Sequence, residues 1–289
     1  MGPLFMVGPN SNWNNMKRLL ILSIIVAFVS CNQNEVPKEW VYQKTIKLDG
    51  VNPIGIAVAS GKLWLSDGDH NRLVQIDENG NIESAHDSLD RPMHIAAMDG
   101  TLFVPQYGND KIESIDEKGK FEMKLQDSLD APAGIAVHKN ERAIADFYNN
   151  RILYAKGENW ISFGKEGKAE GDFYYPTDVQ ITDSLIWVAD AYNNRVQAFD
   201  KQGNFVKMMG QDQKMNAATG IFISDTEVFV TDFENDRILI FDHLGGLKQE
   251  LTRSIAKATD LLIKDDLLHI INYRTGELVI YEQQEIALK

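Results

Sequence analysis

The stretch PIGIAV at residues 53–58 recurs almost unchanged as PAGIAV at residues 132–137. The same slot is occupied in weaker form by PMHI at 92–95, PTDV at 176–179, ATGI at 218–221 and ATDL at 258–261. Successive starts lie 39 to 44 residues apart. Self-similarity at a fixed period of this size indicates an architecture built from structural repeats.

Further stretches repeat within each unit and resemble short strands. An apolar stretch ends in Asp, as in LWLSD at 63–67 and IWVAD at 186–190. A second apolar stretch then follows an Asn-Arg pair, as in NRVQ at 194–197, and leads to a turn such as DENG at 77–80. Short β-branched and aromatic runs between Asn, Asp and Gly turns predict three or four antiparallel strands per unit.

The number of units and the ends of the chain predict how the repeats close. One meander of this size cannot bury both faces of its sheet, whereas radial stacking of such blades buries the faces and protects the strand edges. The last unit, 258–289, is one strand short, and residues 40–48 precede the first unit as a strand-like segment. We therefore predict an all-β, six-bladed β-propeller with four-stranded antiparallel blades. The N-terminal strand joins the C-terminal blade, and a single domain covers 40–289.

The combination of Pro-x-Gly-Ile-Ala-Val, Val-Ala-Asp and Asn-Asn-Arg-Val resembles the NHL repeat, and the resemblance extends over the six units. It implies the propeller fold. It leaves the function open, because proteins with this repeat include scaffolds, ligand receptors and enzymes.

The N-terminal region resembles a bacterial lipoprotein signal. Two basic residues at 17–18 precede an apolar run at 19–29, which is followed by Ser30 and Cys31. The run is shorter than the roughly 20 residues that span a bilayer. The resemblance implies export, lipidation of Cys31 and a lipid anchor as the only membrane attachment, on the periplasmic or the outer surface of the envelope. The alternatives are a plain secretory signal and a buried helix. We assign 1–31 to a leader and signal, and 32–39 to a tether.

The charge balance narrows the classes of partner. The chain has 42 acidic and 29 basic residues and a net charge of −13. Nucleic-acid binding depends on Lys and Arg that neutralise phosphates, so this composition argues against a nucleic-acid partner. We expect a monomer whose partner is a protein, a peptide or a glycan.

Four units carry an Asp five residues before an Arg. A carboxylate at this strand end can accept N–H groups of the following turn and pair with the Arg. Because four blades share the feature, we interpret it as blade architecture. The pairs are Asp67–Arg72, Asp146–Arg151, Asp190–Arg195 and Asp232–Arg237.

A functional site is expected where the repeat is broken. At the start of the innermost strand the odd blades carry glycine, whereas blades two, four and six carry His94, Asp178 and Asp260. Alternate blades point at a common axis, so these side chains could converge on a divalent cation, Ca²⁺ or Zn²⁺. The alternative is that three positions alternate by chance.

The end of the second strand also varies between blades. Gln106 and Asn272 stand where other blades have Asp, and aromatic residues follow in most blades. Aromatics around one face suit stacking on a sugar, a peptide or an apolar ligand, although they also pack between blades. The predicted ligand-binding residues are Gln106, Tyr107, Tyr148, Tyr192, Asn272, Tyr273 and Arg274.

Three functional hypotheses follow, and the third is a sensor or accessory part of a larger envelope complex. The first is an envelope-anchored binding or scaffold module that presents one face to a protein, peptide or glycan. The second is a metal-dependent hydrolase or lyase with an ion on the axis, similar to gluconolactonases or to the peptidyl-hydroxyglycine amidating lyase. Resemblance to that lyase implies zinc held by histidines at the inner-strand start. Here only His94 matches, and Asp178 and Asp260 replace the others. No catalytic residue is identified.

Overall fold

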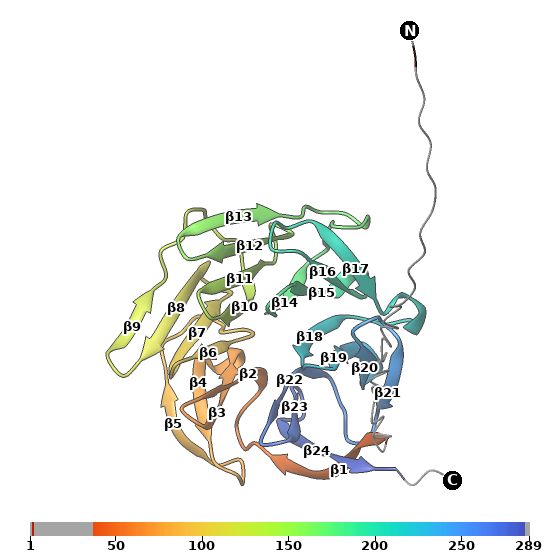
Figure 1. Ribbon diagram of the computed structural model, residues 1–289. Helices are drawn as coiled ribbons and strands as arrows, with labels where there is room; N and C mark the ends of the chain where they lie inside the picture. Colours follow the sequence, from red (N-terminus) through yellow and green to blue (C-terminus); the bar gives the residue numbers. More distant parts are fainter. Residues whose placement is uncertain (1, 3–36, 287–289) are drawn as a thin grey trace. The chain divides into compact units, whose positions relative to one another are not determined.

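A computed structural model describes residue 2 and residues 37–286. Residues 37–286 form six four-stranded antiparallel sheets arranged as blades around a central axis (Figure 1). The predicted six-bladed β-propeller is therefore confirmed. The predicted signal, its lipidation site Cys31 and most of the predicted tether lie outside the described residues.

In blades one to five, the four strands follow one another in chain order from the inner strand to the outer strand. Blade one contains β2 (Pro53–Ala59), β3 (Lys62–Asp67), β4 (Arg72–Ile76) and β5 (Ile82–His86), and blade two contains β6 (Ala96–Met98), β7 (Thr101–Gln106), β8 (Lys111–Asp116) and β9 (Gly119–Glu122). Blade three contains β10 (Pro132–His138), β11 (Glu141–Asp146), β12 (Arg151–Lys156) and β13 (Asn159–Phe163), and blade four contains β14 (Pro176–Ile181), β15 (Ile186–Asp190), β16 (Arg195–Phe199) and β17 (Phe205–Met209). Blade five contains β18 (Ala218–Ile223), β19 (Glu227–Asp232), β20 (Arg237–Asp242) and β21 (Leu247–Leu251).

The sixth blade closes the ring as predicted. It contains β22 (Ala258–Lys264), β23 (Leu267–Asn272) and β24 (Glu277–Glu285), and its outer strand is β1 (Lys38–Lys47) from the N-terminal end of the domain. Trp40 anchors β1: its indole Nε1 donates to the Glu227 carboxylate at 3.2 Å. The Gln249 side chain bonds both the N–H and the C=O of Trp40. These contacts join β1 to blade five, in addition to its pairing with β24 of blade six.

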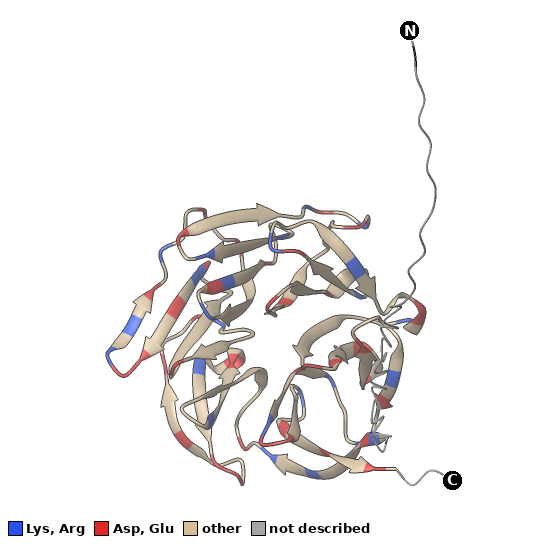
Figure 2. Ribbon diagram, viewed as in Figure 1, with Lys and Arg blue, Asp and Glu red and all other residues tan. Residues whose placement is uncertain are grey.

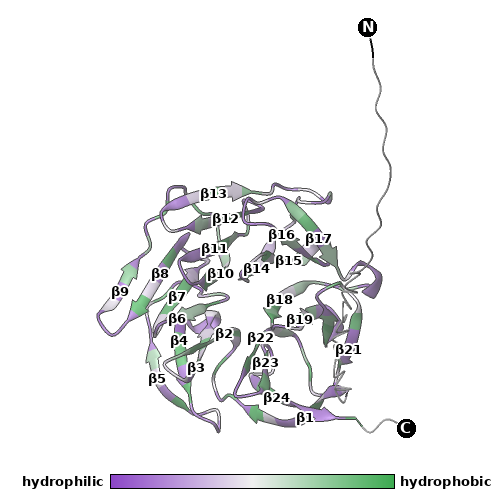
Figure 3. Ribbon diagram, in the orientation of Figure 1, coloured by the Kyte–Doolittle hydropathy of each residue, from purple (hydrophilic) through white to green (hydrophobic). Residues whose placement is uncertain are grey.

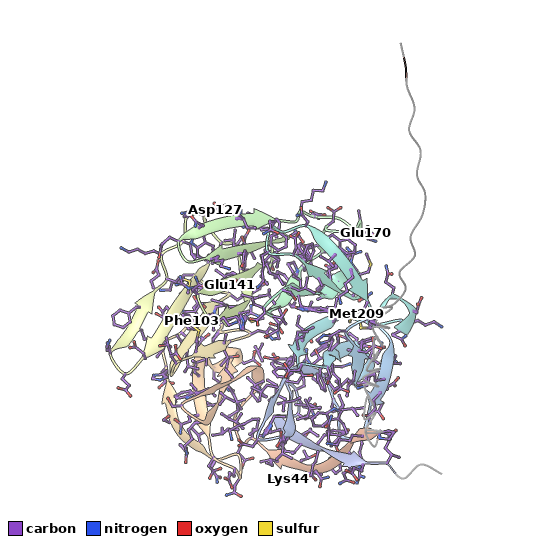
Figure 4. The ribbon with its side chains drawn as sticks, viewed as in Figure 1. Lys44, Phe103, Asp127, Glu141, Glu170 and Met209 are labelled. Carbon is purple, nitrogen blue, oxygen red and sulfur yellow. The ribbon has the colours of Figure 1, made fainter. Side chains whose placement is uncertain are left out.

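Apolar side chains fill the space between neighbouring blades (Figure 4). Trp187, Phe173, Phe199, Phe229 and Phe241 are the largest side chains that are almost fully buried. Burial of a large apolar side chain contributes about 1.5–3 kcal/mol. Apolar residues gather on the middle strands of the blades, and hydrophilic residues are frequent on outer strands and turns (Figure 3).

The Asp–Arg pairs are architectural, but one predicted contact is wrong. The Arg Nε lies 3.0, 2.7, 2.8 and 2.7 Å from an Asp oxygen in blades one, three, four and five. We expected the carboxylate to accept backbone N–H groups of the following turn. Instead it accepts an N–H of the segment that precedes the inner strand, for example that of Tyr174 by Asp190 at 2.7 Å. The reason is that the segment before the inner strand crosses directly over the buried carboxylate. The Asp therefore connects this segment to the second strand of the blade.

The helices among the described residues are single 3₁₀ turns. They are η1 (Gly68–His70), η2 (Ala191–Asn193), η3 (Gln211–Gln213) and η4 (Phe233–Asn235). Within the described part of the chain, no helix has the length and hydropathy that a membrane span requires.

Candidate functional site at the mouth of the propeller axis

The structure brings the three predicted axial side chains together. His94, Asp178 and Asp260 stand at or just before the start of the inner strands β6, β14 and β22, and each is buried. One potential ligand atom from each residue lies within 4.8 Å of the others. This is the convergence from alternate blades that the sequence predicted.

Steric crowding explains why glycine alternates with these residues. A Cβ on Gly55 would lie 2.6 Å from the Met93 carbonyl oxygen, and a Cβ on Gly134 would lie 2.7 Å from that of Thr177. On Gly220 it would lie 2.3 Å from the Thr259 carbonyl oxygen. Each odd blade therefore needs glycine to let the next inner strand approach. The alternation is structural, but it does not dictate that the three larger residues are His, Asp and Asp.

Backbone N–H groups hold both axial carboxylates in place. Asp178 accepts the N–H of Val179 at 2.7 Å and that of Ile221, in the next blade, at 2.8 Å. Asp260 accepts the N–H of Leu261 at 2.8 Å and that of Ile56 at 3.0 Å. Each carboxylate thus joins two blades. Each oxygen keeps a second lone pair that a cation can use.

No Lys or Arg among the described residues pairs with the two axial carboxylates. Asp178 and Asp260 receive hydrogen bonds and ion pairs only from backbone N–H groups and from His94 in this part of the chain. Burial is the main cause that raises the pKa of Asp178, to about 7, and the Asp260 charge adds to it while His94 opposes it. Burial alone would lower the pKa of His94, but the two carboxylates raise it overall. Buried carboxylates without a cationic partner are costly.

The donor set fits a divalent cation. The His94 Nδ1 is buried and has no hydrogen-bond partner among the described residues, although it lies 3.4 Å from an Asp260 oxygen. Imidazole and carboxylate donors are the ligands of zinc and related transition ions, whereas Ca²⁺ prefers six to eight oxygens. The triad therefore suits Zn²⁺ or a similar ion better than Ca²⁺.

Below the triad lies a narrow cavity of about 150 Å³. All six inner strands line it, and Asp260 is part of its wall. Pockets for small organic ligands usually measure about 300–1,000 Å³, so this cavity suits an ion with its water molecules rather than a substrate. An organic ligand has more room at the surface above the triad.

On that surface, blades two, three and four contribute a continuous group of aromatic rings. We call this group the tyrosine cluster; it comprises Tyr107, Phe147, Tyr148, Tyr174, Tyr175 and Tyr192. The Tyr107 hydroxyl donates to that of Tyr148 at 2.6 Å, and neighbouring ring centroids lie 4.5–5.8 Å apart. Tyr148 and Tyr192 are 47% and 59% exposed. The cluster therefore offers both ring faces and hydroxyl groups to solvent.

Two predicted ligand-binding residues are placed inside the blades. Gln106 and Asn272 are buried and take the place of the architectural Asp. The Gln106 Oε1 accepts the N–H of Asp90 at 2.7 Å, and the Asn272 Oδ1 accepts that of Ala256 at 3.1 Å. This placement favours a structural role for both side chains.

Tyr273 and Arg274 lie apart from the tyrosine cluster, in blade six. The Tyr273 hydroxyl donates to the Asp69 carboxylate of blade one, at 2.9 Å. The exposed Arg274 guanidinium lies 5.7 Å from the Tyr273 ring centroid. Blade two offers a similar pair, in which Arg91 lies 4.9 Å from the Tyr107 ring centroid.

The sequence reasoning missed Arg91, Tyr174 and Tyr175. It considered the segment after the second strand, whereas these residues lie in the segment just before the inner strand. The run YYP at 174–176 was the available signal, because it places two aromatic residues directly before the Pro position of the repeat. Arg91 and Tyr175 both occupy that position, with φ angles of +48° and +57°.

Comparisons with known proteins show the fold and support an NHL-like relationship. No family model matches the chain. It is similar in structure to a gluconolactonase from Xanthomonas campestris, at a TM-score of 0.67 and 12% identity over 86% of this chain and 100% of that one. It is also similar to virginiamycin B lyase from Staphylococcus aureus, crystallised in an inactive form with quinupristin, at a TM-score of 0.60 and 18% identity over 87% and 90%.

One local sequence match accompanies these structures. Protein lin-41 from Caenorhabditis elegans is 45% identical over 47 residues, or 16% of this chain, and the match spans only 4% of that protein. The matched length slightly exceeds one repeat of this chain and fits the NHL-like relationship.

Proposed function

We propose that this protein binds a ligand on the tyrosine cluster, above a divalent cation held by His94, Asp178 and Asp260. One observation carries the proposal: the segments that lead into the inner strands contribute to both features. His94 follows Arg91 by three residues, and Asp178 follows Tyr175 by three residues. A partly exposed group of tyrosines is a natural surface for rings that carry hydroxyl groups, so a glycan is the ligand class we favour over a protein or a peptide.

A binding assay with a matched control tests the ligand surface. A glycan array probed with the purified protein should give signals that the double variant Tyr148→Ala/Tyr192→Ala loses, because both rings are exposed and free to stack. Phe121→Ala on the outer strand β9 removes a ring that is 50% exposed and should change nothing. The proposal fails if no glycan binds, or if the tyrosine variant binds as well as the Phe121 variant.

Metal-dependent hydrolysis or elimination is the second candidate function. The convergence of His94, Asp178 and Asp260 favours it, and the similar folds of a gluconolactonase and a lyase are compatible with it. A divalent cation in this position would polarise a carbonyl or lower the pKa of water. The protein's part would be to hold the ion through three fixed donors and to orient the substrate on the tyrosines. Turnover of lactone substrates that is lost in Asp178→Asn but not in Phe121→Ala would establish this function.

We further propose that the protein is an exported monomer anchored to the bacterial envelope through a lipid on Cys31. The basic residues, apolar run and Cys at 17–31 support this proposal. Labelling of cells with a fatty-acid analogue should tag the wild type and not Cys31→Ala, and that variant should move from the membrane to the soluble fraction. Equal labelling of both proteins would contradict it.

A further inference from the structure

We infer that the mouth of the axis selects an acidic saccharide, a pyranose chain that carries carboxylate groups, and this inference rests on the ligand-binding function proposed above. It joins two observations: the tyrosine cluster offers rings to stack on, and two exposed arginines at the same mouth have no ion-pair partner among the described residues. Such arginines are unexpected on a chain whose net charge is −13.

The segments of Arg91 and Arg274 meet at one turn of blade one, residues 68–71. Arg274 lies over the ring of Tyr273, whose hydroxyl donates to Asp69, and the Arg91 backbone N–H donates to the Asn71 side chain at 2.9 Å. Accordingly, the positive charges of both arginines oppose the rise in the pKa of Tyr273 that burial and the Asp69 hydrogen bond cause. Each guanidinium lies over a tyrosine ring, at 4.9 Å in blade two and 5.7 Å in blade six. Stacking of this kind holds the guanidinium plane while its N–H groups stay available for bidentate bonds to a carboxylate.

Three acidic side chains near the two arginines already have partners. Asp69 accepts from the Tyr273 hydroxyl and from the Asn52 amide at 2.9 Å. Glu234 pairs with Lys257 at 3.2 Å, and the same Lys257 lies 3.4 Å from Asp236. Most charged residues are spread over the outer strands and loops (Figure 2). Lys257 is thus already paired, whereas Arg91 and Arg274 keep their positive charge for a ligand.

The surroundings favour a saccharide over an acidic peptide. Tyrosine presents a flat ring for the C–H face of a sugar and a hydroxyl for its polar groups. A peptide often gains its affinity by adding a strand to a free sheet edge. The outer strands of the blades, such as β9 and β13, provide those edges, and the mouth is built from loops and from the starts of inner strands.

The test compares an acidic and a neutral trisaccharide by isothermal titration calorimetry. Trigalacturonate and galactotriose share the ring and the linkage and differ in their carboxylates. A chelator in the buffer keeps any cation from contributing. We expect trigalacturonate to bind about tenfold more tightly, because charge-assisted bonds to arginine are stronger than neutral ones. The preference should shrink as the salt concentration rises toward about 0.5 M.

Variants assign the preference to the two arginines. Arg91→Gln/Arg274→Gln should remove the preference by lowering the trigalacturonate affinity to that of galactotriose in the same variant. Arg253→Gln is the matched control, because its guanidinium also lies over a tyrosine at 4.2 Å, and this tyrosine, Tyr42, belongs to the outer strand β1. All variants should melt at the wild-type temperature, since the changed side chains are exposed.

The outcomes separate this inference from the function on which it rests. Equal affinity for the two trisaccharides, or a preference that survives in the arginine variant, overturns the acidic selectivity but leaves glycan binding standing. If neither trisaccharide binds and a hexaglutamate peptide binds through the same arginines, the saccharide assignment is wrong. If Tyr148→Ala/Tyr192→Ala binds neither trisaccharide and the arginine variant binds both as the wild type does, the proposed function is supported and the acidic selectivity is overturned.

Discussion

Two sets of buried carboxylates in this molecule look alike in the sequence and differ in their surroundings. In the blades, Asp190 is fully buried and pairs with Arg195 at 2.8 Å. On the axis, Asp178 and Asp260 are almost as buried, but their hydrogen-bond and ion-pair partners in the described part of the chain are only backbone N–H groups and His94. The first set is neutralised within the blade. The second set needs protons or an external cation, and this difference distinguishes architecture from a candidate site.

The largest expected effect comes from removing a carboxylate that the blade itself neutralises. Asp190→Ala should lower the free energy of unfolding by about 3–5 kcal/mol, because Arg195 is left buried without its partner. Asp178→Asn, measured without metal at pH 8, should change it by less than about 1 kcal/mol, because it removes an uncompensated charge. Urea denaturation of both variants checks this contrast, and equal losses would erase the distinction between the two sets.

The pH dependence of stability should come from the axial set. The folded-state pKa of Asp178 is raised to about 7 by burial and Asp260, and that of His94 is raised by the two carboxylates. A raised folded pKa contributes stability at low pH that is lost as the pH rises through it. The metal-free protein should therefore lose about 2–4 kcal/mol between pH 5 and pH 8. Asp178→Asn should show a clearly flatter profile in the same denaturation series; an unchanged slope would contradict this origin.

The glycine alternation around the axis can be tested by crowding it. Gly220→Ala should cost about 1–3 kcal/mol, because the new Cβ would lie 2.3 Å from the Thr259 carbonyl oxygen and 2.9 Å from the Asp260 Cα. Gly50→Ala serves as a control: its Cβ meets no atom within 4 Å, and only its φ of +71° is unfavourable. Thermal unfolding should rank Gly220→Ala as the more damaging change. The reverse order would mean that the inner strands can move apart.

The smallest expected effect is a difference in stability loss between two Asp–Arg pairs of the architectural set that differ in burial. Arg72 pairs with Asp67 at 3.0 Å but its side chain is 23% exposed, whereas the Arg195 side chain is 6% exposed. Arg72→Gln should cost about 1 kcal/mol, since solvent screens the pair. Arg195→Gln should cost roughly two or three times as much, because the ion pair is better shielded from solvent and the change also removes hydrogen bonds to three backbone carbonyl groups. Equal losses in chemical denaturation would show that burial does not control these pairs.

The repeat and the count of strands were sufficient to predict the fold from the sequence. PIGIAV and its relatives indicated the inner strands, and the short last unit indicated that residues 40–48 complete blade six; the strand is found at Lys38–Lys47. The convergence of His94, Asp178 and Asp260 was also predictable, because the period fixes which slots meet at the axis. What could not be predicted depends on irregular loops. The period does not specify that Tyr174, Tyr175 and Arg91 face the same mouth, or that Gln106 turns inward to bind the Asp90 N–H.

The most direct test of this account is the metal content of the axis. The full-length protein, purified without chelator and loaded with Zn²⁺, should retain one ion per chain by mass spectrometry and should melt at a higher temperature than the metal-free protein. His94→Ala and Asp178→Asn should retain no ion and should not respond to Zn²⁺, while Asp190→Asn, in the architectural set, should still respond. A wild-type protein that retains no ion, with a melting temperature indifferent to Zn²⁺ and Ca²⁺, would contradict the account.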